Sequence, residues 1–324
     1  MNGSPDMKGC YVGFDTSNYT TSVAVCDEEG RILANLKAPL PVKAGERGLR
    51  QSDALFAHTK HLPGLCDRLG ALLRERELIP LAVGVSARPR DVKDSYMPCF
   101  LAGVSAAHSF AAARNLPLYE FSHQNGHVMA ALYSAGQISR LMKQPFLAFH
   151  VSGGTTEMLL VQPKGADFSV TLVGETEDIN AGQVIDRVGV SLGLSFPCGR
   201  ELESLAASYE GTPYRHPVCV RNGRCSLSGV ENIALRLRNE TGDASAVAAF
   251  VFDFIGRTLI RMGEQTMETY GTMPVLFAGG VMSNRLMRGE LLRHFDAYFA
   301  EPEFSADNAA GIVLLCRGRY AFEK

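Results

Sequence analysis

In Cys10-Tyr-Val-Gly-Phe-Asp15, a short run of apolar and small residues has the composition of a buried strand, and Thr21-Ser-Val-Ala-Val-Cys26 repeats it a few residues later. The turn Asp27-Glu-Glu-Gly30 then leads into a third such run, from Arg31 to Lys37. Runs of β-branched and aromatic residues that are bounded by turn residues are typical of strands joined in hairpins. The chain is therefore predicted to open with an antiparallel meander.

The same pattern restarts in the middle of the chain. Phe146-Leu-Ala-Phe-His-Val151 is followed by the turn Ser152-Gly-Gly154 and by two further strand-like runs, Thr156-Glu-Met-Leu-Leu-Val161 and Ser169 to Val173. Segments with helical periodicity, such as Ser52 to Glu77, lie between the two meanders. Two halves that each open with a meander indicate an internal duplication.

Length and composition favour a globular protein of two domains. A chain of 324 residues is large for one hydrophobic core, so two domains with a ligand-binding cleft are expected. Hydrophobic residues make up 46% of the chain and charged residues 20%, which excludes wholesale disorder. The formal charge of −2 argues against binding of nucleic acid through bulk charge, so RNA is permitted as a substrate but not indicated.

The sequence also predicts a cytoplasmic protein without a membrane partner. No apolar run reaches the roughly 20 residues that span a bilayer, and the stretch from Met1 to Lys8 does not resemble a signal peptide. The eight cysteines are scattered and form no Cys-x-x-Cys pair, so the sequence lacks the cysteine spacing that is typical of a zinc cluster.

Three short loops share one design, in which a strand ends in small or hydroxyl residues. They are Gly13-Phe-Asp-Thr-Ser17, Ser152-Gly-Gly-Thr-Thr156 and Ala278-Gly-Gly-Val281. Glycine lets a phosphate approach the backbone amides, and Ser or Thr hydroxyls supply further donors. Each loop alone is more often only a turn, but together they favour a nucleotide-binding cleft. The sequence has neither a Walker A loop nor a G-x-G-x-x-G fingerprint, which excludes the P-loop and dinucleotide-binding classes.

The segment His123-Gln-Asn-Gly-His127 places two imidazoles four residues apart, a spacing that puts both on one face of a helix. Such a pair is either a metal-ligand set or two cap and core residues, and the spacing alone leaves both interpretations open. Asp307 is the best candidate for an acidic third ligand. A His₂Asp set with open positions suits zinc, iron or manganese. The zinc-protease motif needs Glu after the first His, where this chain has Gln124, so proteolysis is disfavoured.

Through these motifs, the chain resembles the tRNA threonylcarbamoyladenosine synthase family, formerly called O-sialoglycoprotein endopeptidase or glycoprotease. The resemblance runs nearly end to end. Its matching segments are Gly13 to Ser17, His123 to His127, Val151 to Gly154, Gly174 to Asp178, Ala181 to Asp186, Phe196 to Gly199, Ser226 to Gly229, Ala278 to Arg285, and Asp307-Asn308.

The resemblance implies an α/β protein of the actin/sugar kinase/Hsp70-like fold. Two ribonuclease-H-like domains would enclose a nucleotide cleft, and the last helix would return to the first domain. The expected domains are residues 1–121 plus 304–324, and residues 122–303 with an irregular insertion near 206–229.

The resemblance further implies a metal-containing, nucleotide-binding transferase. Such an enzyme moves threonylcarbamoyl from its adenylate to N6 of adenosine 37 in tRNA, with the metal as a Lewis acid. His123, His127 and Asp307 would hold iron or zinc, Mg²⁺ could accompany the nucleotide, and a small paralogous subunit or a second copy could be a partner. The positions expected to bind ATP or the acyl-adenylate are Ser17, Ser152, Gly153, Gly154, Thr155, Asp186, which would contact the ribose, Gly199, Gly279, Gly280 and Asn284.

Three departures from the family pattern raise a rival hypothesis. The family has an acidic pair where this chain has Tyr19-Thr20, a histidine at Thr155, and a Gly-Pro-Gly loop where this chain has Ala87 to Asp94. These changes are compatible with a divergent paralogue that uses another acceptor. They are also compatible with a catalytically reduced paralogue that serves as a nucleotide-binding scaffold or regulatory partner.

Overall fold

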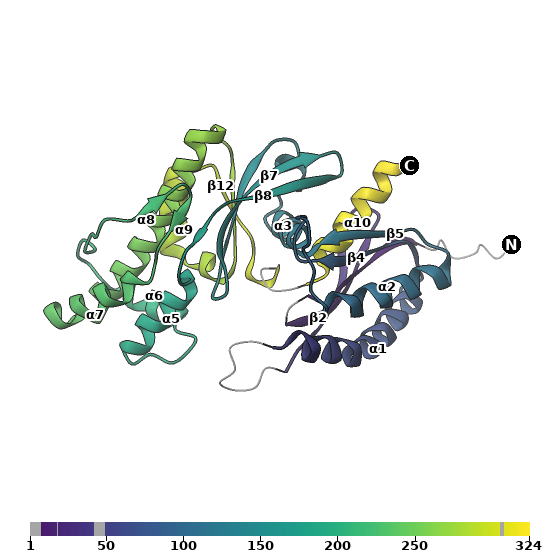
Figure 1. Ribbon diagram of the computed structural model, residues 1–324, viewed down its shortest axis with the longest axis horizontal. Helices are drawn as coiled ribbons and strands as arrows, with labels where there is room; N and C mark the ends of the chain where they lie inside the picture. The colour runs from purple at the N-terminus through teal and green to yellow at the C-terminus, as the bar shows by residue number, and fades with distance from the viewer. Residues whose placement is uncertain (1–7, 18, 42–48, 305–307) are drawn as a thin grey trace. The chain divides into compact units, whose positions relative to one another are not determined.

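The computed structural model describes residues 8–17, 19–41, 49–304 and 308–324 (Figure 1). The chain divides into two compact units. Unit 1 comprises Met1–Ile138, Pro163–Ser169 and Ala306–Lys324, and unit 2 comprises Ser139–Gln162 and Val170–Ser305.

Unit 1 is built on a five-stranded mixed sheet. Its first three strands form the predicted antiparallel meander, and the last two run parallel to β1. The strand order is β3 (Ile32–Pro39), β2 (Thr20–Asp27), β1 (Lys8–Asp15), β4 (Leu78–Arg88) and β5 (Leu118–Ser122).

Alternation along β1 explains how helices cover both faces of this sheet. Val12 and Phe14 point into a core that α1 (Gln51–Glu75) and α2 (Phe100–Arg114) complete. Gly13 points to the opposite face, where a Cβ would lie 2.8 Å from the backbone nitrogen of Val313 in α10 (Ala310–Glu323). The missing side chain therefore lets the last helix lie directly on the sheet of unit 1, as expected from the sequence (Figure 1).

Helix α3 (His123–Ser134) packs against α10, and for this reason it belongs to unit 1. The domain division drawn from the sequence placed residues 122–138 in the second domain. The difference has a physical cause: Gly126 of α3 and Gly311 of α10 bring the two helix backbones together, and a Cβ on Gly311 would overlap the Gly126 carbonyl.

Unit 2 carries a seven-stranded sheet that begins with the second predicted meander. The β6–β7 pair is antiparallel, whereas β11 runs parallel to β6 and β12 runs parallel to β11. The region 206–229, expected to be irregular, includes two short strands that extend the sheet. The strand order is β12 (Ala297–Phe299), β11 (Val275–Ala278), β6 (Phe146–Val151), β7 (Thr156–Lys164), β8 (Asp167–Thr176), β10 (Arg224–Cys225) and β9 (Val220–Arg221).

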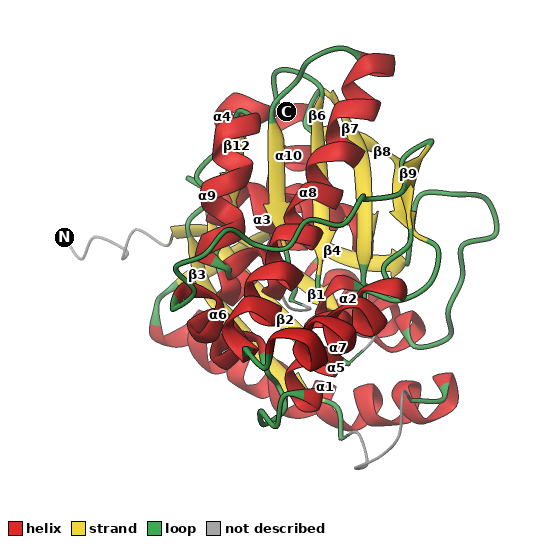
Figure 2. Cartoon of the chain, turned by 90° about the vertical axis from the view of Figure 1, so that its left-hand side faces the viewer, coloured by secondary structure: helices red, strands yellow, loops and turns green. Residues whose placement is uncertain are grey.

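The long helix α8 (Ala244–Tyr270) is the centre of the core of unit 2 (Figure 2). Asp243 caps its first turn, and Gly271 follows its last residue, with a positive φ that favours glycine. Apolar residues surround most of the helix, as is typical of a buried helix. The helices that pack against α8 are α5 (Ala181–Ser191), α6 (Gly199–Ala207), α7 (Gly229–Thr241) and α9 (Arg285–His294). The other short helices of this part of the chain are α4 (Ile138–Leu141), η1 (Gly280–Ser283) and η2 (Pro302–Phe304).

Among the described residues, no helix combines the length and apolar character that crossing a lipid bilayer requires.

Candidate functional site

The histidine pair occupies the first turns of α3. Ser122 caps this helix, its hydroxyl accepting a hydrogen bond from the backbone N–H of Asn125 at 3.2 Å. The rings of His123 and His127 lie with their centroids 4.3 Å apart and their planes at 79°. The structure therefore brings the two imidazoles together, as the spacing predicted.

A buried carboxylate orients the first of these rings. Nδ1 of His123 lies 3.0 Å from Oδ2 of Asp15, whose side chain is 1% exposed. Oδ1 of Asp15 accepts hydrogen bonds from the Ser17 amide at 2.8 Å and from the Ser86 hydroxyl at 2.6 Å. Burial opposes ionisation of Asp15, but the charge of His123 and these hydrogen bonds outweigh it and lower the pKa of the carboxyl.

An ionised Asp15 can only accept a hydrogen bond, so Nδ1 of His123 carries the hydrogen atom. In the neutral ring the lone pair is then on Nε2. Metal-ligating histidines usually donate their other ring N–H to a carboxylate or carbonyl in this way. The environment of His123 therefore fits a metal ligand better than a cap or core residue.

The pair supplies two ligands of the predicted set. Asp307, the predicted third ligand, lies outside the described residues. Within the described ranges, no three His, Cys, Asp or Glu side chains gather closely enough to hold a metal ion. Ser17, predicted to bind nucleotide, follows β1 beside Asp15, and its buried hydroxyl has no hydrogen-bond partner in the described part of the chain.

The loop from Ala87 to Asp94, one of the departures from the family pattern, lies against the N-terminus of α3. The backbone N–H of Gln124 donates to the Pro89 carbonyl at 3.0 Å, and the Ser122 hydroxyl donates to Asp91 at 3.1 Å. Arg88 also pairs with Asp91 at 2.6 Å. The altered loop is thus part of the surroundings of His123.

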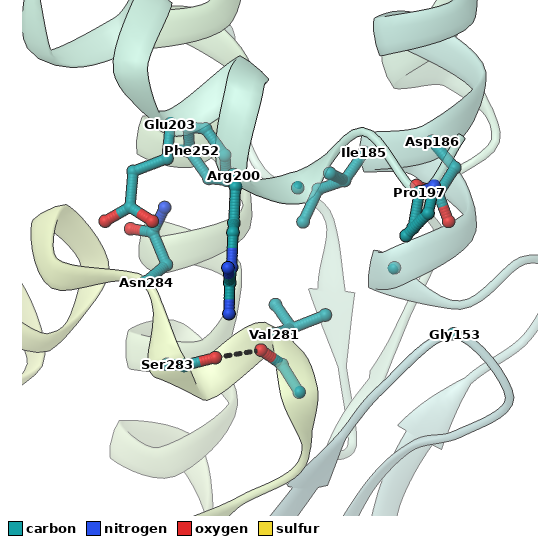
Figure 3. A pocket seen from close by; sticks show the side chains of 13 residues that line it. Gly153, Ile185, Asp186, Pro197, Arg200, Glu203, Phe252, Val281, Ser283 and Asn284 are labelled. Carbon is teal, nitrogen blue, oxygen red and sulfur yellow. Dashed lines mark hydrogen bonds between the residues drawn. The ribbon is translucent and has the colours of Figure 1, made fainter. Parts of the chain in front are cut away.

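Unit 2 contains a pocket of about 320 Å³ (Figure 3). It is formed by the N-terminal turns of α5 and α6, by η1 and the start of α9, and by one side chain of α8. Five residues predicted to bind nucleotide line it: Gly153, Asp186, Gly199, Gly280 and Asn284. Ser152, Gly154, Thr155 and Gly279 were predicted as well but are not among its lining residues.

Two of these other positions shape the turns around the pocket. The Ser152 hydroxyl accepts hydrogen bonds from the amides of Gly154 at 3.2 Å and Thr155 at 3.1 Å, which closes the β6–β7 turn. Gly279 has a φ of +102°, and a Cβ there would overlap the Val151 carbonyl. Glycine is therefore required where η1 approaches the end of β6.

Asn284 is held at the pocket with one donor unused. Ser283 and Asn284 are both favourable capping residues, and the cap of α9 is Asn284, whose Oδ1 accepts a hydrogen bond from the Met287 amide at 2.9 Å. Ser283 instead belongs to η1, and its hydroxyl donates to the Gly280 carbonyl (Figure 3). Nδ2 of Asn284 is buried and has no hydrogen-bond partner among the described residues. A buried donor without a partner is costly unless a ligand satisfies it.

Carboxylates lie at both sides of the pocket. Asp186 accepts from the Cys198 amide at 2.9 Å, and Glu203 accepts from the Arg285 amide at 2.7 Å. Sequence reasoning missed Glu203 although it lies one turn after Gly199 on α6, a spacing that could have revealed it. The other lining residues that it missed are Gly182, Ile185, Pro197, Arg200, Phe252, Val281 and Ser283.

A family model described as TsaD, tRNA N6-adenosine threonylcarbamoyltransferase, matches residues 96–314. The chain belongs to this family. A tRNA N6-adenosine threonylcarbamoyltransferase of Streptococcus gordonii is 30% identical over 353 residues, which cover 98% of this chain and 99% of the relative. One from Methanopyrus kandleri is 30% identical over 309 residues, which cover 93% of this chain and 85% of the relative. The family predicted from the sequence motifs is thus confirmed.

Solved structures confirm the predicted fold class. A ROK family protein from Streptococcus pneumoniae in complex with sucrose aligns with a TM-score of 0.57 at 12% identity, covering 97% of this chain and 100% of that one. HypF from T. kodakarensis aligns with a TM-score of 0.56 at 12% identity, and the alignment covers 97% of this chain and 48% of HypF. At these identities the alignments establish the actin/sugar kinase/Hsp70-like fold alone.

Proposed function

We propose that this protein transfers a threonylcarbamoyl group from its adenylate to N6 of adenosine 37 in tRNA. Membership of the tRNA N6-adenosine threonylcarbamoyltransferase family supports the reaction, and near full-length relatives carry that name. In the transfer, the N6 amine forms a bond to the carbonyl carbon of the threonylcarbamoyl group, the bond from that carbon to the phosphate oxygen breaks, AMP leaves, and the amine releases one proton to solvent. A tRNA substrate favours the cytoplasm, and a small paralogous subunit or a second copy is a candidate partner.

The observation that carries the proposal is the unsatisfied Nδ2 of Asn284 in the pocket of unit 2. A volume of about 320 Å³ is at the lower end of the range for small-molecule pockets. We assign the AMP portion of ATP or of the acyl-adenylate to this pocket. Asp186 would accept from the ribose hydroxyls, the amides near Gly153 would meet the phosphate, and Asn284 would donate to the nucleoside.

We assign a divalent metal ion, iron or zinc, to His123 and His127, with Asp307 as the third ligand. Such an ion, when bound, supplies Lewis-acid polarisation of a carbonyl or phosphoryl oxygen. Asp15 fixes the orientation of the His123 ring through the 3.0 Å contact to Nδ1. Mg²⁺ would accompany the nucleotide phosphates.

Asn284→Asp is expected to lower the affinity for ATP about tenfold, because the substitution removes the Nδ2 donor. It keeps the side-chain oxygen that caps α9, so the thermal unfolding midpoint should stay close to that of the wild type. Isothermal titration calorimetry measures the affinity, and Asn239→Ala, at an exposed asparagine of α7, is the matched control. Equal ATP affinity in the Asn284→Asp variant and the wild type would remove Asn284 from the nucleotide site.

The activity itself is tested with the wild-type chain. A strain depleted of its own transferase should regain threonylcarbamoyladenosine at position 37 of its tRNA when it expresses this protein, as measured by nucleoside mass spectrometry. If nucleotide and metal bind but no modified nucleoside forms, the transferase proposal fails and the scaffold hypothesis takes its place.

A further inference from the structure

Arg200 brings a positively charged side chain into the pocket of unit 2, where the nearby carboxylates are already engaged. It lies in the first turn of α6, and its side chain descends into the pocket towards Ser283 (Figure 3). Its guanidinium group makes no ion pair or hydrogen bond with any described residue. The two carboxylates that line the pocket, Asp186 and Glu203, each accept a hydrogen bond from a backbone amide. An arginine that lines a pocket without a protein partner is available to a ligand.

The position of Arg200 within the pocket indicates which part of a nucleotide it meets. Arg200 lies on the side of Asn284 and Ser283, whereas Asp186 and the Gly153 turn lie on the other side (Figure 3). With the phosphate near the turn and the ribose near Asp186, the part of the nucleotide that remains for Arg200 is the base. This placement rests on the nucleotide site that we propose above.

We propose that Arg200 binds the purine ring of the nucleotide, with its planar guanidinium stacked on the face of the base. Guanidinium groups are planar, weakly hydrated and well suited to stacking on aromatic faces. Stacking leaves the edge of the base to the Nδ2 donor of Asn284 on the same side of the pocket. Arg200 would thus contribute to affinity through the base, independently of the phosphates.

Calorimetry with adenosine, AMP, ATP and inorganic triphosphate separates a base contact from a phosphate contact. Arg200→Ala is expected to lower the affinities for adenosine, AMP and ATP by one common factor of about ten, within the range of cation–aromatic interactions. Arg200→Lys keeps the positive charge but loses the planar guanidinium group, so its affinities should lie between those of Arg200→Ala and the wild type. Arg236→Ala, at an exposed arginine of α7 outside the pocket, should bind all the nucleotides as the wild type does.

Two results would overturn the assignment of Arg200 while leaving the nucleotide site intact. One is unchanged adenosine affinity in both Arg200 variants. The other is a loss confined to ATP and triphosphate and restored by lysine, which would identify a phosphate contact. If the wild-type protein binds neither adenosine nor ATP, both the nucleotide site and the role of Arg200 are refuted. Arg200 is exposed, so its replacement should leave the thermal unfolding midpoint unchanged.

Discussion

His123→Ala is expected to release the bound metal ion and to abolish tRNA modification, with the fold retained. The variant loses one of the two imidazoles that α3 brings together, and with it the ring that Asp15 orients. Loss of an orienting partner alone typically lowers metal affinity by roughly 10- to 100-fold, so loss of the ligand itself should cost more. Metal content after dialysis, measured by inductively coupled plasma mass spectrometry, and nucleoside analysis of the tRNA give the two readouts.

Two further variants separate the parts of this arrangement. Asp15→Asn should keep His123 but weaken metal binding by roughly 10- to 100-fold, because a neutral amide orients the ring less strongly than a carboxylate. His108→Ala replaces a surface histidine of the same unit, whose side chain is 61% exposed, and should leave the metal content unchanged. Stoichiometric metal in the His123→Ala protein would refute the site.

Local patterns predicted the elements of the fold and the pairing of the two histidines. The meander at Cys10 to Lys37 follows from runs of strand-forming residues between turns, and the four-residue spacing of His123 and His127 follows from helical geometry. These features depend on residues that are close in the sequence. The partner of His123 could not be read in this way, because Asp15 lies 108 positions away.

Tertiary packing decided the features that sequence reasoning missed. Arg200 and Phe252 meet in one pocket only because α6 packs against α8, and neither residue belongs to a motif. At the start of α9, Ser283 and Asn284 are both favourable capping residues. Ser283 is the last residue of the short helix η1, so Asn284 is the residue that caps α9. Propensity alone could not choose between the two.

The second large effect is expected at the crossing of α3 and α10. In Gly311→Ala, the new Cβ would overlap the carbonyl oxygen of Gly126 and lie 2.7 Å from its carbonyl carbon. Both groups belong to the backbone, so the helices must separate. Overpacking of this kind costs about 3 kcal/mol, the upper part of its usual range. The thermal unfolding midpoint, followed by circular dichroism, should fall by roughly 5–10 °C.

A matched glycine distinguishes this collision from an ordinary helix substitution. Gly64 lies inside α1 of the same unit, with open space where its Cβ would be, so Gly64→Ala should be neutral or stabilise the fold by up to about 1 kcal/mol. Because Gly126 lies between His123 and His127, separating the helices also displaces the histidine pair. Gly311→Ala should therefore bind metal more weakly even at temperatures where it remains folded. Unchanged metal affinity in a destabilised Gly311→Ala protein would mean that the close crossing supports the fold of unit 1 but does not position the two ligands.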